Sequence, residues 1–160
     1  MRKTLGLIIC IMFTILFAGC RNLGGELIVG ERIQTSEIKD FYYTVSTSTN
    51  PPDFWRYRYY KDGDKWVFHY EKREGDHWPL SEDDITEFCD VDLTDAQRDE
   101  FFSYITNGKV TKREESADSG DGGPWLYIYW DGDKDEYQVY SFESYGKRQE
   151  FETFSESLIQ

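Results

Sequence analysis

The chain has 160 residues, of which 31 are acidic and 18 are Lys or Arg, so its formal charge is −13. A surface with this excess of carboxylates repels nucleic acid, which we therefore exclude as a partner. Aromatic residues make up 18% of the chain, and we expect Trp, Tyr and Phe to supply much of the hydrophobic core.

The first twenty residues have the pattern of an export signal. Arg2 and Lys3 form a short positive segment, and from Leu5 to Gly19 the residues are apolar or small, with Thr14 as the exception. A membrane-spanning helix needs about 20 apolar residues, and this run ends earlier, at Cys20 and Arg21. The pattern therefore predicts a secretory signal peptide over residues 1–19.

The end of this segment, Leu16-Phe17-Ala18-Gly19-Cys20, resembles the lipobox of bacterial lipoproteins. The resemblance implies that Cys20 receives a diacylglyceryl group and becomes the first residue after cleavage. It also implies a protein that is lipid-anchored at the extracytoplasmic face of a bacterial cell membrane. Two other interpretations remain open: an ordinary signal peptide cut after Gly19, and an uncleaved N-terminal anchor.

Beyond the signal peptide we predict a tether over residues 20–39 and a single α+β domain over residues 40–160. Without Arg2 and Lys3, 16 basic residues face 31 acidic ones, a formal charge of −15. Cys10 leaves with the signal peptide and Cys20 carries the lipid, so Cys89 is the only thiol expected in the folded domain. An intramolecular disulfide is therefore excluded.

Residues 41–48 alternate between apolar and polar side chains, which predicts a half-buried strand. A hairpin follows, in which Phe54–Tyr60 and Lys65–Glu71 flank a turn at Asp62-Gly63. In the predicted register Tyr59 faces Trp66, and all the aromatic side chains at alternate positions share one face. This aromatic face would hold Trp55, Tyr57, Tyr59, Trp66, Phe68 and Tyr70.

The same register places a basic strip on the opposite face of the hairpin. We define the basic strip as Arg56, Arg58, Tyr60, Lys65 and His69. Two interpretations compete for it. Neighbouring acidic strands could neutralise the strip through cross-strand pairs, or its arginines could bind an anionic polymer of the cell envelope through bidentate contacts.

The second half of the chain carries mostly helix signals. Residues 81–89 place Ile85, Phe88 and Cys89 on one helical face, and Thr94 with Gln97 forms a capping box before a helix that ends at residues 107–108. We expect a strand within 109–115, a loop at 116–123, and a second hairpin whose strands are 125–130 and 136–142. A closing helix would carry Phe151, Phe154 and Leu158 inward.

Together these elements predict an α+β fold. It would contain an antiparallel sheet of about five strands, built from two hairpins and an N-terminal strand, with two or three helices packed on one face. This arrangement is similar to small uncharacterised lipoproteins of bacteria that carry a tethered α+β domain. That resemblance implies no particular activity.

No residue pattern predicts catalysis, a cofactor or a metal site. The acidic spacing of 131–135 is typical of the start of a calcium loop, but Glu136 stands where the loop needs glycine and Phe142 where it needs glutamate. His69 and His77 have no Cys or His at ligand spacing, and no nucleophile motif or phosphate-binding loop is present.

We therefore carry two hypotheses of different kinds. The first is a non-catalytic binding or interaction module that contacts an envelope protein or an anionic polymer. The second is a hydrolase of envelope or extracellular polymers, which would need two carboxylates about 5 to 9.5 Å apart in a cleft and a raised pKa on at least one of them.

Overall fold

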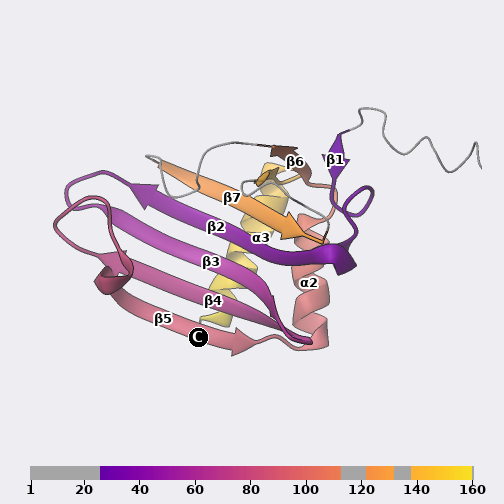
Figure 1. The fold of residues 1–160 in the computed structure, drawn as a ribbon, viewed down its shortest axis with the longest axis horizontal. Coiled ribbons are helices and arrows are strands. Elements are labelled where there is room, and N and C mark those ends of the chain that lie inside the picture. Colours follow the sequence, from indigo (N-terminus) through magenta and orange to yellow (C-terminus); the bar gives the residue numbers. More distant parts are fainter. Residues whose placement is uncertain (1–25, 113–121, 132–137, 160) are drawn as a thin grey trace, which may run out of the picture.

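The computed structural model describes residues 26–112, 122–131 and 138–159. The predicted signal peptide, Cys20, and the loop segments 116–121 and 132–135 lie outside the described residues. Within them, eight antiparallel strands form one open sheet, and two α-helices cover one of its faces (Figure 1). The strands are β1 Leu27–Ile28, β2 Ile38–Thr47, β3 Asp53–Asp62, β4 Lys65–Glu74, β5 Ile85–Asp92, β6 Lys109–Lys112, β7 Gly122–Trp130 and β8 Gln138–Ser141. The helices are α2 Asp95–Ile105 and α3 Tyr145–Leu158, with single 3-10 turns at Thr35–Glu37 and Glu82–Asp84.

The strands follow the order β1-β6-β8-β7-β2-β3-β4-β5 across the sheet, so β1 and β5 are its two edges. β2 lies inside the sheet between β3 and β7, as its alternating sequence requires, with Phe41 and Tyr43 buried on the helix side. The α+β class and the antiparallel sheet are confirmed. The predicted count of about five strands is too low, because β1, β5 and β6 extend the sheet at both edges.

The predicted tether over 20–39 is wrong for its described part, residues 26–39. Leu27 and Ile28 pair with β6, and the side chains of Val29, Ile33 and Ile38 are buried in the core. Gly30 has a φ of +89° in a tight turn, which is closed by the hydrogen bond that its N–H donates to the Ile33 carbonyl. The folded domain therefore begins before the predicted boundary at residue 40.

The short helix predicted over residues 81–89 is also wrong, because residues 85–92 form β5. Ile85, Phe88 and Cys89 have helical spacing, but a segment of eight residues is too short for the apolar period to decide between helix and strand. The choice between helix and strand is made by β4. β3 pairs with one side of β4, and residues 85–92 form a strand because they pair with its other side. Phe88 consequently lies on the opposite face from Cys89 and is exposed.

The first hairpin is confirmed with a shifted register. Asp62 pairs with Lys65, so the two turn residues are Gly63 and Asp64 instead of Asp62 and Gly63. Of these two turn residues, only Gly63 has a positive φ, +60°. A positive φ at the first turn residue alone is typical of a type II′ turn. Tyr59 therefore faces Phe68 instead of Trp66. A shift of two residues keeps every side chain on its predicted face.

Both predicted longer helices are present. Thr94 and Gln97 form the expected capping box at the start of α2, which is followed by Asn107 in the left-handed conformation at a φ of 66°. In α3, Phe151 and Phe154 are buried with Leu158, as the helical spacing predicts.

The core lies between the sheet and the two helices and is mainly aromatic. The ring of Tyr59 stacks on Phe101 of α2 with centroids 4.1 Å apart, and Phe41 meets Phe151 of α3 edge-on at 5.6 Å. Two buried tyrosines of the core satisfy their hydroxyl groups: Tyr59 bonds the Ser155 hydroxyl at 2.8 Å, and Tyr140 donates to the Ile105 carbonyl at 3.0 Å. We call the helix-covered side of the sheet the inner face and the other side the outer face.

Candidate functional site

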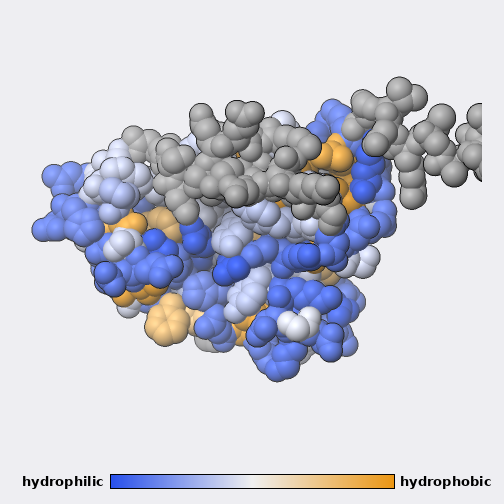
Figure 2. Space-filling model, in the orientation of Figure 1, coloured by the Kyte–Doolittle hydropathy of each residue, from blue (hydrophilic) through white to orange (hydrophobic). Residues whose placement is uncertain are grey.

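The five residues of the basic strip all lie on the outer face of β3 and β4, and the fold brings them together. Arg58 is directly opposite His69 in the ladder, and Lys65 follows the turn that connects the two strands. Figure 2 shows the outer face as largely hydrophilic, with hydrophobic atoms emerging along its lower margin, where β5 runs in Figure 1.

Acidic side chains from neighbouring strands pair with the strip. Arg58 makes a two-pronged contact with Asp40 of β2, through Nε to Oδ1 at 3.1 Å and Nη2 to Oδ2 at 2.6 Å. On the other side of the hairpin, His69 Nδ1 lies 2.8 Å from Asp90 Oδ1, and Lys65 forms an ion pair with Asp92. These three acids come from β2 and β5, the strands that flank the strip.

Glu71 is the centre of this network and is only 6% exposed. Its Oε1 accepts a hydrogen bond from Arg73 Nη2 at 2.8 Å and lies 3.5 Å from Arg56 Nη1, while its Oε2 lies 3.5 Å from His69 Nε2. Burial acts to raise the pKa of Glu71, but the contact with His69 and the charges of Arg56 and Arg73 outweigh it and hold the pKa below its usual value. Glu71 is therefore a stable anion.

The opposite shift affects His69. Its contact with Glu71 raises the pKa of the imidazole, burial acts in the opposite direction, and the bond to Asp90 adds to the rise. The protonated imidazole then bridges two carboxylates from adjacent strands, which ties β4 to β5.

Aromatic rings enclose the arginines of the network. The guanidinium of Arg58 lies 4.5 Å from the Tyr60 ring centroid and 5.0 Å from that of Tyr42, and Arg73 lies 4.3 Å from that of Phe54. These are cation–π distances. Burial, followed by the nearby Asp40 carboxylate, raises the pKa of Tyr42 to about 12, so its phenol stays neutral.

This arrangement favours the first interpretation of the basic strip. Each cation of the network has a carboxylate partner. Arg58 pairs with Asp40 and Lys65 with Asp92. Arg56 and Arg73 share Glu71, and protonated His69 contacts Glu71 and Asp90. An anionic ligand would have to displace carboxylates that the fold already holds in place. The network joins four neighbouring strands, β2 to β5, and its role in the molecule is cross-strand stabilisation.

Three members of this cluster were not predicted from the sequence: Asp40, Glu71 and Arg73. A signal was available for two of them, because Glu71 and Arg73 continue the alternation that places Lys65 and His69 on the outer face. The partner role of Asp40 depends on the pairing of β2 with β3, which single-strand patterns do not give.

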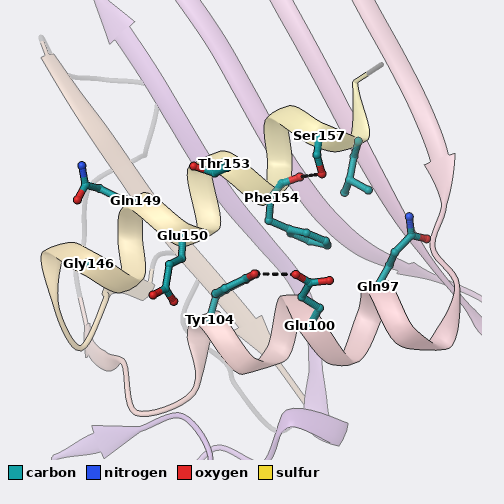
Figure 3. A pocket seen from close by; sticks show the side chains of 10 residues that line it. Gln97, Glu100, Tyr104, Gly146, Gln149, Glu150, Thr153, Phe154 and Ser157 are labelled. Atoms are coloured by element: carbon teal, nitrogen blue, oxygen red, sulfur yellow. Dashed lines mark hydrogen bonds between the residues drawn. The ribbon is translucent and has the colours of Figure 1, made fainter.

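A groove of ≈ 820 Å³ runs between α2 and α3 on the far side of the helices from the sheet (Figure 3). Glu100 and Tyr104 line it from α2, and Glu150, Thr153 and Phe154 from α3. The Tyr104 hydroxyl donates to Glu100 Oε1 at 2.7 Å. Burial and this carboxylate raise the pKa of Tyr104 to about 12. Lys147 pairs with Glu150 at 2.9 Å.

The hydrolase hypothesis requires a carboxyl group whose pKa is raised. Two carboxyl groups of the described residues have shifted pKa values, Glu71 and Asp84, and both are lowered. For Asp84 the main cause is the hydrogen bond from the Ser81 backbone N–H at 2.6 Å. Both groups are thus protonated less often near neutral pH than free carboxylic acids, so they are less available as general acids.

Among residues 26–112, 122–131 and 138–159, no group of three His, Cys, Asp or Glu side chains is placed to hold a metal ion. No helix in that part of the chain is long and apolar enough to cross a membrane. Comparisons with protein-family models, curated proteins and solved structures found no match to this chain.

Proposed function

We propose that this protein is a bacterial lipoprotein, anchored by lipid on Cys20 at the extracytoplasmic face of the cell membrane, whose domain is a non-catalytic binding module. One observation carries the proposal: the lipobox-like segment ends at Cys20, and the first strand of the described domain, β1, already begins at Leu27.

The short connection constrains how the domain would sit on the membrane. Five residues lie between Cys20 and Glu26, and the six residue-to-residue steps that join them can span at most about 20 Å. The lipid would therefore hold β1, one edge of the sheet, close to the bilayer. Seven strand spacings of about 4.8 Å separate β1 from the opposite edge, β5, by about 34 Å across the sheet.

One feature supports binding over catalysis, and a second bears on the kind of partner. The shifted carboxyl groups are stabilised as anions, whereas a general acid needs the reverse. The charges of the basic strip are paired within the protein, which also favours a protein partner over an anionic polymer.

Mass spectrometry of the full chain expressed in a bacterium tests the anchor. We expect the membrane fraction to contain a mature protein that begins at Cys20 with diacylglycerol on its sulfur. The control is Cys20→Ser, which keeps a small polar side chain but cannot form the thioether; it should retain residues 1–19 and gain no lipid mass. A normally processed Cys20→Ser product would overturn the lipoprotein assignment.

A further inference from the structure

The outer edge of β5 has features of a docking site for another strand. Leu93 donates its backbone N–H to the Trp66 carbonyl of β4 at 2.9 Å. Backbone groups alternate in direction along a strand, so Val91 and Cys89 also point toward β4. The N–H and C=O groups of Phe88, Asp90 and Asp92 then point outward, to the side of β5 on which the described residues place no strand.

This edge carries acidic side chains but lacks the lysines and prolines that commonly block strand addition. Natural edge strands are often blocked by lysine, proline or bulges, yet residues 82–95 contain neither Lys nor Pro. The one irregularity in the pairing with β4 lies at Lys72 and Arg73, and from Glu87 to Asp92 the ladder is regular. A regular stretch of six residues is long enough to hold a short added strand.

The two faces of β5 offer different contacts to such a strand. On the outer face Phe88 is 68% exposed, beside the half-exposed carboxylates of Asp90 and Asp92. On the inner face Cys89 and Val91 are partly buried against the core. An added strand would thus meet carboxylates on one side and apolar side chains on the other.

The negative charge of residues 82–95 indicates which kind of strand would pair with β5. Residues 82–95 hold seven Asp or Glu and no basic residue. A second copy of the chain would bring two rows of carboxylates together, and like charges on adjacent strands destabilise their pairing. Asp90 and Asp92 each form an ion pair through one oxygen, with His69 and Lys65 respectively. A cationic side chain on the incoming strand would instead be attracted to the excess of carboxylates and could pair with their second oxygens.

We propose that β5 binds an extended basic segment of a partner protein by strand addition. The segment would carry Lys or Arg at alternate positions opposite Asp90 and Asp92, and aliphatic residues opposite Cys89 and Val91. This inference rests on the proposed binding function and gives it a partner class. Backbone hydrogen bonds provide the affinity in this mode of recognition, and the alternating side chains provide the specificity.

The test is an NMR titration of the full chain in detergent micelles with a capped six-residue peptide of alternating lysine and valine. We expect slowed hydrogen exchange at the outward amides of Phe88, Asp90 and Asp92, little change at Cys89 and Val91, and weaker binding at high salt. A peptide with glutamate in place of lysine is the control. Equal binding of both peptides, or no protection at β5, would overturn the proposal.

Two substitutions at one position separate backbone pairing from charge. Asp90→Asn removes the charge but keeps the N–H, and we expect it to weaken binding about 2- to 5-fold, as for an exposed ion pair. Asp90→Pro also removes the outward N–H, a change that edge strands tolerate, and it should weaken binding at least about tenfold. Equal effects of the two changes would contradict strand addition.

If the Asp90→Pro variant does not fold, the pattern of slowed amide exchange in the unmodified chain still tests strand addition at β5. Self-association through β5, detected by sedimentation of the peptide-free chain, would also contradict the proposal. Because this titration does not depend on lipid, its failure leaves the anchor untouched. Loss of the anchor in turn leaves the edge of β5 unaffected.

Discussion

On the inner face of the sheet, β3 and β4 carry aromatic side chains packed beneath α2 and α3, whereas on the outer face they carry arginines, a histidine and Glu71. The same two strands thus contribute to stability in two ways. Burial of aromatic surface is non-directional and independent of ionisation. The outer network stabilises the fold only while its charged groups keep their partners, so we expect pH and substitution to affect the two faces differently.

The largest effect should come from the inner face. Phe101 is 0% exposed and stacks on Tyr59, so Phe101→Ala should lower the free energy of unfolding by about 3–5 kcal/mol. The matched control is Phe88→Ala on the exposed edge of β5, which should change it by less than about 0.5 kcal/mol. Urea denaturation measures both. Similar losses for the two variants would mean that the core is not where the fold places it.

The next effect concerns the centre of the outer network. Glu71→Gln keeps the shape of the side chain but leaves the buried guanidinium of Arg73 without its anion, and we expect a loss of about 2–3 kcal/mol. Lys65→Ala removes an ion pair in which both side chains are more than half exposed, and should cost less than about 0.5 kcal/mol. A Glu71→Gln protein as stable as Lys65→Ala would show that the network adds nothing to stability.

The smallest effect is a pH dependence from the outer face. The pKa of folded His69 is raised above its ordinary value of 6.5, because protonated His69 is held by Glu71 and Asp90, with Arg58 opposite as the nearby cation. The stabilisation is therefore complete below pH 6.5 and is lost as the pH rises through the raised folded-state pKa.

Denaturation curves below pH 6 and above the His69 transition measure this loss. His69→Gln should remove it, while Phe101→Ala, on the inner face, should keep it. A pH slope that persists unchanged in His69→Gln would assign the effect to another group.

Much of each face could be predicted from the sequence. The alternation in β3 and β4 is strict, so the aromatic set and the basic strip fall on opposite faces even though the turn was placed one residue too early. A change of register by two residues exchanges cross-strand partners without exchanging faces. The partners of Arg58 and His69 could not be predicted, because Asp40 and Asp90 belong to strands whose pairing depends on long-range contacts.

The sequence alone determined features that depend on a few adjacent residues: the Thr94 capping box, the presence of the first hairpin, and the amphipathic pattern of α3. Tertiary structure decided the fate of short apolar segments. Leu27–Ile28 and Ile85–Asp92 are too short to specify a structure alone, and each became a strand because β6 and β4 had unpaired backbone groups beside them. Backbone groups must find partners on folding, and the neighbouring strand, which is distant in sequence, supplied them.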